Sequence, residues 1–271
     1  MHCGVEIVPF GEFSDPRVVM RFARAAEAAG WEGLSLWDHI NVPYGAGDPW
    51  VLLASAASVT RKIKLIVGVS PLPRYRPHLL ARTLASLDIL SQGRLVLGAG
   101  IGGQESEFTA YAEESAAGVR AEKLDESLEL LEKFWTKEQV IHKGKHYTIN
   151  GAGQRPTPVQ RPRIPVWIGG ESLPALRRAA KWDGWIIGVV DENCQVIKTP
   201  ERLAGQVTYI RKHRTEQTSF DVAIDGTTSP ERAVEFIQPY AEAGATWYFE
   251  ALFGLRGSVE EMMERVMAGP F

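Results

Sequence analysis

Residues 77–103 read PHLLARTLASLDILSQGRLVLGAGIGG, and this stretch contains the unit from which the fold is built. Pro77 stands where the first turn of a helix accepts proline, leucines recur after it at helical spacing, and Gly93 ends the helix. The apolar run 95–97 then predicts a buried strand, and a glycine-rich turn follows it. The stretch therefore predicts a helix, a strand and a loop, in that order.

The same alternation runs along the whole chain. Short apolar runs that predict strands alternate with longer amphipathic stretches that predict helices, the seventh of which begins at Ser229-Pro230 and ends at Gly244. The predicted strands cover residues 5–8, 34–37, 63–69, 95–97, 166–168, 185–189, 220–224 and 246–249. Strict alternation implies a parallel sheet with right-handed crossovers.

Eight strand–helix units in 271 residues match a closed (β/α)8, or TIM, barrel in number and size. A doubly wound open sheet is the structural alternative. No linker interrupts the pattern, so we expect one domain over residues 1–271. An insertion is expected at about 136–163, where two short runs flank Lys143-Gly144-Lys145 as in a small hairpin.

Composition narrows the function classes. The chain is 45% hydrophobic and 23% charged with a net charge of −3, which is ordinary globular composition without the basic excess of a nucleic-acid-binding protein. No apolar run approaches the roughly 20 residues of a membrane span, and residues 1–10 hold no signal peptide. Cys3 and Cys194 suggest neither a disulfide framework nor a zinc site. We therefore expect a cytoplasmic protein with no membrane and no nucleic-acid partner.

The active site of such a barrel lies at the carboxyl ends of its strands, which directs attention to Asp38 and His39 after the second strand. A histidine there can donate, accept or transfer a proton near neutral pH. The alternative is a structural histidine paired with Asp38 or with a loop carbonyl. No second histidine stands two or four residues away and no cysteine pair accompanies it, so no metal is expected.

Two glycine-containing turns follow other strands. The segment from Gly98 to Gly103, which also contains Gly100 and Gly102, fits G-x-G-x-x-G literally, but the following strand comes too late for a dinucleotide fingerprint. We interpret this loop as backbone kept free of side chains so that a flat ligand can lie over it, and a plain tight turn is the alternative.

The second glycine-containing turn joins a strand to a helix. Gly169 and Gly170, followed by Glu171 and Ser172 at the helix start, predict free N–H groups at the positive end of a helix dipole, which suits a phosphate. An ordinary capped helix start is the alternative reading.

Taken together, these motifs resemble the bacterial luciferase-like flavin oxidoreductases. The resemblance covers residues 4 to about 190 in the family's order, and the last third matches mainly through its periodicity. The segments that carry it are 26–33 with 37–39, 76–77 with 80–82, 85–94 with 98–102, 165–172, 177–180 and 183–185.

The resemblance implies a TIM barrel that binds FMN or the deazaflavin F420 at the strand ends. By motif match, His39 beside Asp38 is similar to the family's active-site histidine, and Glu171 and Ser172 to residues at the cofactor phosphate. The segment Gly68-Val69-Ser70 resembles the place where the family often has a non-prolyl cis peptide behind the isoalloxazine. Because no Cys-Arg pair follows the fourth strand, light emission from a long-chain aldehyde is not expected.

The leading hypothesis is an FMN-type monooxygenase of a small organic substrate, with a non-covalently bound reduced cofactor that a flavin reductase could supply. An F420-dependent reductase or dehydrogenase, to whose acidic cofactor tail Arg74 and Arg76 could contribute, is the first alternative. A flavin-binding protein without turnover is the second, although an intact Asp38-His39 argues against it. A metal-dependent hydrolase is a fourth reading, and it lacks a His-x-His after the first strand. The family resemblance also implies a homodimer.

Overall fold

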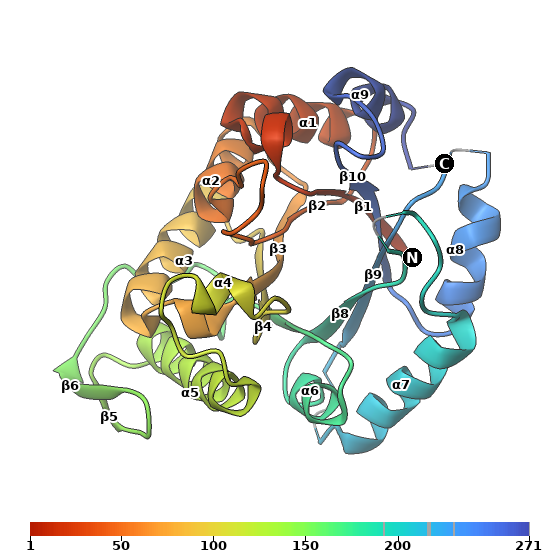
Figure 1. The fold of residues 1–271 in the computed structure, drawn as a ribbon. Coiled ribbons are helices and arrows are strands. Elements are labelled where there is room, and N and C mark those ends of the chain that lie inside the picture. Colours follow the sequence, from red (N-terminus) through yellow and green to blue (C-terminus); the bar gives the residue numbers. More distant parts are fainter. Residues whose placement is uncertain (192, 216–217, 230, 271) are drawn as a thin grey trace.

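The computed structural model describes residues 1–191, 193–215, 218–229 and 231–270. Eight parallel strands close a barrel in the order β1-β10-β9-β8-β7-β4-β3-β2, and helices surround it (Figure 1). The strands are β1 (His2–Ile7), β2 (Gly33–Leu36), β3 (Lys64–Pro71), β4 (Leu95–Gly100), β7 (Val166–Gly169), β8 (Gly184–Gly188), β9 (Asp221–Gly226) and β10 (Trp247–Leu252). Because each strand has a neighbour on both sides, the predicted (β/α)8 barrel is confirmed and the open doubly wound sheet is excluded.

The helices follow the strands as the sequence predicts. They are α1 (Pro16–Ala28), α2 (Pro49–Val59), α3 (Pro77–Ser91), α4 (Ser106–Thr109), α5 (Ala117–Thr136), α6 (Leu173–Ala179), α7 (Pro200–His213), α8 (Ala233–Glu242) and α9 (Val259–Met267). Asp15 and Asp48 cap α1 and α2 by accepting hydrogen bonds from backbone N–H groups, each just before a proline. The expected helix start at Ser229-Pro230 includes Pro230, which lies outside the described residues, and α8 begins at Ala233. The short α4 is a helix that the apolar periodicity does not predict.

Alternation along the strands separates two cores. Val5 and Ile7 of β1 point outward to the helices, so Glu6 between them points into the barrel. The interior is filled by a compact apolar cluster of Ile66, Val96, Trp167, Ile186, Ala223, Trp247 and Phe249. Glycines and polar residues take over the inward positions near the strand ends, as at Gly68, Gly98 and Asp225.

A two-stranded antiparallel sheet lies outside the barrel, within the expected insertion. It consists of β5 (Val140–Lys143) and β6 (Thr148–Ala152). Glu126 of α5 accepts hydrogen bonds from the backbone N–H groups of His146 and Tyr147, each 2.9 Å long. The hairpin is therefore fixed to α5.

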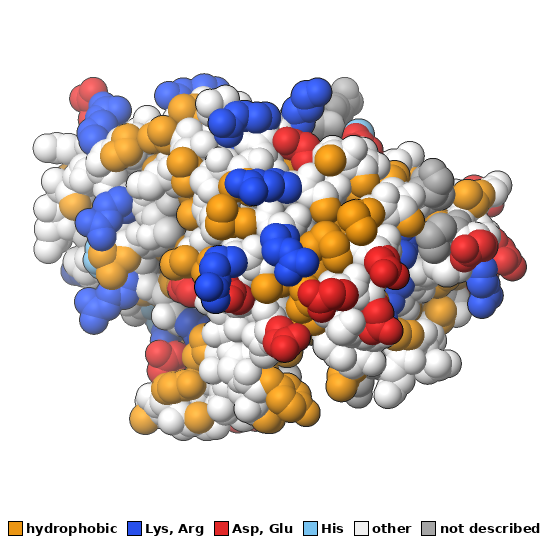
Figure 2. All heavy atoms as spheres, turned by 90° about the horizontal axis from the view of Figure 1, so that it is seen from above, with side chains coloured by type: hydrophobic (Ala, Val, Ile, Leu, Met, Phe, Trp, Pro, Cys, Tyr) orange, Lys and Arg blue, Asp and Glu red, His pale blue; other side chains and the backbone are white. Residues whose placement is uncertain are grey.

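The surface over α1 and α9 carries no dominant charge. Figure 2 looks down on this side of the barrel and shows Lys and Arg side chains interspersed with Asp and Glu. Arg21 of α1 and Glu260 of α9 approach to 3.8 Å across it. Within the described ranges, no helix has the length and apolar character needed to cross a membrane.

Candidate active site

His39 is positioned by a carboxylate on another element. It follows β2, and its Nδ1 lies 3.0 Å from Oε1 of Glu107 in α4, a helix that lies over the β3–β4 side of the barrel (Figure 1). The rings of Phe10 and Trp37 contact the imidazole, with centroids 5.9 and 5.7 Å away. The His39 side chain is 22% exposed, whereas that of Glu107 is fully buried. The imidazole is thus held from behind and open on one side.

Glu107 sits in surroundings that favour its ionised form. Burial alone would raise the pKa of this carboxyl group, but a hydrogen bond from the Ile40 N–H and the charges of His39 and Arg74 hold the pKa below its ordinary value. The Ile40 N–H donates to Oε1 over 2.8 Å. An anionic Glu107 fixes the proton of His39 on Nδ1 and leaves Nε2 to exchange a proton with a ligand.

Asp38 points away from His39 into a buried network. Its Oδ1 accepts a hydrogen bond of 2.9 Å from Arg74, and its Oδ2 accepts bonds from the hydroxyls of Tyr75, at 2.8 Å, and Ser70. Burial raises the pKa of Asp38, and the Arg74 charge with the two hydroxyl bonds opposes that rise. Arg74 also lies 3.5 Å from Glu107. One guanidinium therefore holds both carboxylates.

This arrangement differs from the sequence reading in two respects. The partner of His39 is Glu107, 68 positions further along the chain, and not the adjacent Asp38. Ser70, expected at the cofactor, directs its hydroxyl to Asp38 and is fully buried. The first difference arises because α4, which follows β4, places Glu107 against His39 and the Ile40 N–H. The second arises because β3 pairs with β2, so that Ser70 at its end reaches Asp38.

A bulge in β3 forms one wall of the site. The pairing of β3 with β4 shifts register between Val67 and Ser70, and the Gly68–Val69 peptide bond is cis. Gly68 and Val69 are both partly exposed. The non-prolyl cis peptide implied by the family resemblance is present in this segment.

The neighbouring glycines make room for that bulge. A Cβ on Gly98 or Gly100 of β4, or on Gly169 of β7, would lie 2.9–3.1 Å from the methyl groups of Val69. A Cβ on Gly102, where φ is +89°, would lie 2.8 Å from the Phe108 ring. The glycines are therefore needed for close packing of protein against protein, whereas the sequence reading expected bare backbone open to a flat ligand. The Val69 side chain packs on these glycines and is partly exposed toward the mouth of the barrel.

The turn after β7 combines free backbone donors with a helix start. Gly170 has φ +100°, and the Ser172 hydroxyl caps α6 by accepting from the Ala175 N–H at 3.4 Å. Among the described residues, the N–H groups of Glu171 and Ser172 donate to no protein acceptor. Such donors can hold an anion.

Two cations that sequence reasoning missed lie beside this turn. Lys198 is buried and Arg202 belongs to α7; both bind the Glu171 carboxylate, Arg202 at 2.8 Å. The bond from Lys198, with the charges of both cations, lowers the pKa of Glu171. Glu171 thus faces α7. No sequence motif marks these cations, whereas Glu107 had one available signal: it is an acidic residue in a short stretch directly after a strand-end glycine loop.

The described part of the chain contains no group of three or more His, Cys, Asp or Glu side chains arranged to hold a metal ion. The candidate site has three parts at the carboxyl ends of the strands. They are the His39–Glu107 pair, the bulge at Val69 and the free backbone N–H groups of Glu171 and Ser172. This fold and this site define the class of (β/α)8 barrel enzymes.

Comparison with known proteins specifies the family. A model described as luciferase-like monooxygenase matches residues 7–246, and the chain belongs to that family. An uncharacterised protein of Mycobacterium tuberculosis (strain ATCC 25618 / H37Rv) is 30% identical over 217 residues, which are 77% of this chain and 69% of the relative. The family and these comparisons identify the chain as an oxidoreductase of the luciferase-like kind.

Two solved structures share the fold at low identity. An F420-dependent secondary alcohol dehydrogenase in complex with an F420-acetone adduct has a TM-score of 0.81 at 15% identity, over 98% of both chains. The oxygenating constituent of 3,6-diketocamphane monooxygenase from Pseudomonas putida, a type II Baeyer-Villiger monooxygenase in complex with FMN, has a TM-score of 0.72 at 18% identity, over 99% of this chain and 78% of that one. At these identities the likeness establishes the fold alone.

Proposed function

We propose that this protein is an FMN-type monooxygenase of a small organic substrate, with the cofactor held at the carboxyl ends of the strands. The observation that carries the proposal is that the proton-transfer pair, the bulge and the anion-binding turn occupy one barrel mouth. The residues fit the group: Val69 offers a surface for a flat ring, and the N–H groups of Glu171 and Ser172 offer free donors for a phosphate. When bound, the flavin supplies the redox chemistry.

The chain's own residues handle the proton. Glu107 holds the Nδ1 side of His39, so Nε2 is the atom that gives or takes a proton at the substrate or the cofactor. Arg74 keeps both carboxylates in place from behind. Trp37 and Phe10 shield two sides of the imidazole from water.

An F420-dependent reductase or dehydrogenase is the second candidate. Lys198 and Arg202 place positive charge beside the anion-binding turn, which favours a cofactor with additional negative charge. The curated relatives include an F420-dependent glucose-6-phosphate dehydrogenase, and one structural neighbour holds F420. A flavin-binding protein without turnover would need no oriented histidine, so the His39–Glu107 pair argues against that reading.

The anion-binding turn is tested by Ser172→Ala. Loss of one hydrogen bond at the phosphate should weaken binding of FMN or F420 by about 1 kcal/mol, or roughly fivefold. Ser258→Ala is the matched control, because Ser258 also caps a helix, α9, through its hydroxyl. Fluorescence titration of both variants should show weaker binding only for Ser172→Ala. Equal cofactor affinity in the two variants would show that the turn is not part of the cofactor site.

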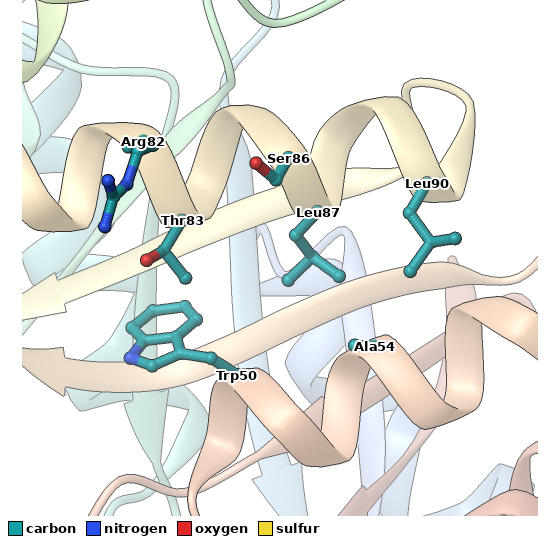
Figure 3. A pocket seen from close by; sticks show the side chains of 7 residues that line it. All are labelled: Trp50, Ala54, Arg82, Thr83, Ser86, Leu87 and Leu90. Carbon is teal, nitrogen blue, oxygen red and sulfur yellow. The ribbon is translucent and has the colours of Figure 1, made fainter. Parts of the chain in front are cut away.

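We propose a homodimer formed through α2 and α3. Figure 3 shows the groove between these helices, where Trp50 and Ala54 of α2 face Leu87 and Leu90 of α3. Val51 is 57% exposed and Leu90 49%, so apolar surface continues beyond the groove. Sedimentation velocity at micromolar concentration should show a dimer that Leu90→Arg dissociates, and a monomeric wild type would exclude it.

The same proposal has two cellular corollaries. A reduced flavin used as a shuttled co-substrate would come from a separate flavin reductase. The thiols of Cys3 and Cys194 are free, which supports the proposed cytoplasmic location.

A further inference from the structure

Two inward-facing carboxyl groups of the barrel are not used by the site described above. Glu6 of β1 is buried, with 1% of its surface exposed, and Asp225 is half-buried near the end of β9, on the same inward-facing side as Ala223. Oε1 of Glu6 accepts a hydrogen bond of 2.8 Å from the Ser35 hydroxyl. Oε2 is buried and has no hydrogen-bond partner among the described residues. Oδ1 of Asp225 accepts from the Val189 N–H at 3.2 Å.

These carboxyl groups lie at the candidate active site. A Cβ on Gly68, the first residue of the cis peptide in the β3 bulge, would lie 3.4 Å from Oε1 of Glu6. A Cβ on Gly188 of β8 would lie 3.2 Å from Oδ1 of Asp225. Acidic side chains on β1 and β9 therefore pack beside Gly68 of β3 and Gly188 of β8, next to the bulge.

No cation within the described residues lies within 4 Å of either carboxyl group, in contrast to the other buried acids near the strand ends. Around Glu6, β2 contributes Ser35, β3 contributes Gly68 and β10 contributes Ala251. The next carboxylate on β10, Glu250, points outward to Arg256 and Arg265. Among the residues that the structure describes, Asp225 is thus the ionisable group that faces Glu6.

Glu6 and Asp225 lie within hydrogen-bonding reach of each other. Two neighbouring carboxyl groups without a cation disfavour ionisation of both. Burial and the neighbouring Asp225 charge raise the pKa of Glu6 well above its ordinary value, although hydrogen bonds from Trp37 and Ser35 oppose that rise. Burial also raises the pKa of Asp225, against the hydrogen bond from the Val189 N–H. One bound proton removes the repulsion between the two groups and lets one of them donate a hydrogen bond to the other. Such a pair titrates as a unit.

We propose that Glu6 and Asp225 share one proton at neutral pH and form a second proton-donating site, which binds a neutral, hydrogen-bond-accepting group of the substrate such as a carbonyl oxygen. The proposal rests on the proposed function in one respect, namely that a substrate enters this barrel mouth. Two carboxyl groups that share one proton still carry one negative charge. The pair therefore disfavours binding of a carboxylate or phosphate group in the same position. His39 exchanges a proton at the β2 side of the mouth. The Glu6–Asp225 pair donates a hydrogen bond at the β1 and β9 side.

Infrared spectroscopy of the cofactor-free protein tests the shared proton directly. A protonated carboxyl group absorbs at higher frequency than the amide band, and wild type should show this absorption at neutral pH. Glu6→Gln should remove it, because Gln can donate to Asp225 and let that group ionise. Glu126→Gln is the matched control: Glu126 is a carboxylate whose pKa is held low by its partners despite partial burial, so this variant should keep the absorption.

Each other result overturns the proposal. Wild type without the absorption would show that both groups are ionised or separated. Absorption that survives in Glu6→Gln would place the proton elsewhere. Should Glu6→Gln not fold, Asp225→Asn applies the same test, because changing the partner must shift the absorption of Glu6; an unchanged frequency would contradict a pair. None of these results depends on cofactor binding, so the cofactor titration tests the proposed function separately.

Discussion

At the scale of the residue, His39 is the group on which the proposed proton transfer depends. Its Nδ1 is bound to Glu107 and its ring is partly open to the mouth. We expect His39→Ala to lower turnover by about 10²–10⁴-fold, the usual contribution of a general acid or base. Cofactor affinity and melting temperature should change little, because the residue is at the edge of the core. A lower melting temperature with normal turnover per folded molecule would make His39 structural.

Arg74 gives the second residue-scale prediction. Its side chain is 5% exposed and lies between two buried carboxylates, Asp38 and Glu107. Replacing it by leucine leaves both without their cation, so Arg74→Leu should lower the free energy of unfolding by about 3–5 kcal/mol. Urea denaturation measures this. Arg17→Gln, which breaks an exposed pair with Asp15, is the control and should change stability little. Equal effects would mean that Arg74 does not hold the network.

Sequence reasoning reached some residues of the site and missed others for a physical reason. His39 and the turn from Gly169 to Ser172 follow strands directly, so their place at the mouth could be predicted from periodicity. Periodicity does not locate Glu107 or Lys198, because each reaches its partner through a segment whose path the apolar pattern does not determine, although the place of Glu107 after a strand-end glycine loop was a signal.

At the scale of the element, the contact between β3 and β4 shapes the mouth. A methyl group on Gly98 would collide with the carbonyl oxygen of Val67 and press on Val69. Gly98→Ala should therefore cost about 1–3 kcal/mol of stability, the usual range for overpacking. Gly103→Ala, where a Cβ meets nothing within 4 Å, is the control. Thermal unfolding that gives the two variants the same melting temperature would contradict the packing described for the bulge.

The elements themselves were the most predictable part of the structure. Strand and helix order followed from the apolar runs and from prolines that open helices, as at Pro49 and Pro77. The irregularity of β3 did not follow from periodicity, since the register shift after Val67 involves the pairing with β4. The family resemblance, and no local pattern, directed attention to Gly68-Val69-Ser70. The glycines of β4 were predicted as special positions, but what fills their space is a neighbouring side chain.

At the scale of the whole molecule, the Glu6–Asp225 pair should shape the dependence of stability on pH. Because the folded-state pKa of Glu6 is raised, the folded protein holds a proton that the unfolded chain loses above pH about 4.3. Stability therefore falls as pH rises from there toward the folded-state value, by up to about 1.4 kcal/mol per pH unit for one proton. Glu6→Gln should flatten this slope in urea denaturation from pH about 5 to about 8. An unchanged slope would show that the pair holds no extra proton.

The barrel as a whole accounts for the position of the site. Closing eight strands brings residues from β1, β2, β3, β7 and β9 to one mouth, although they are distributed over more than two hundred positions of the chain. The family assignment and the geometry both direct attention to that mouth as the place of the cofactor.

The most direct test of this account is a difference spectrum of the purified protein titrated with FMN and, separately, with F420, each oxidised and reduced. The account predicts saturable binding of one cofactor per barrel. The Ser172→Ala variant should bind the cofactor more weakly, and the His39→Ala variant should bind it as the wild type does. Titrations of the folded protein in which neither cofactor, in either redox state, gives a saturable change would contradict it.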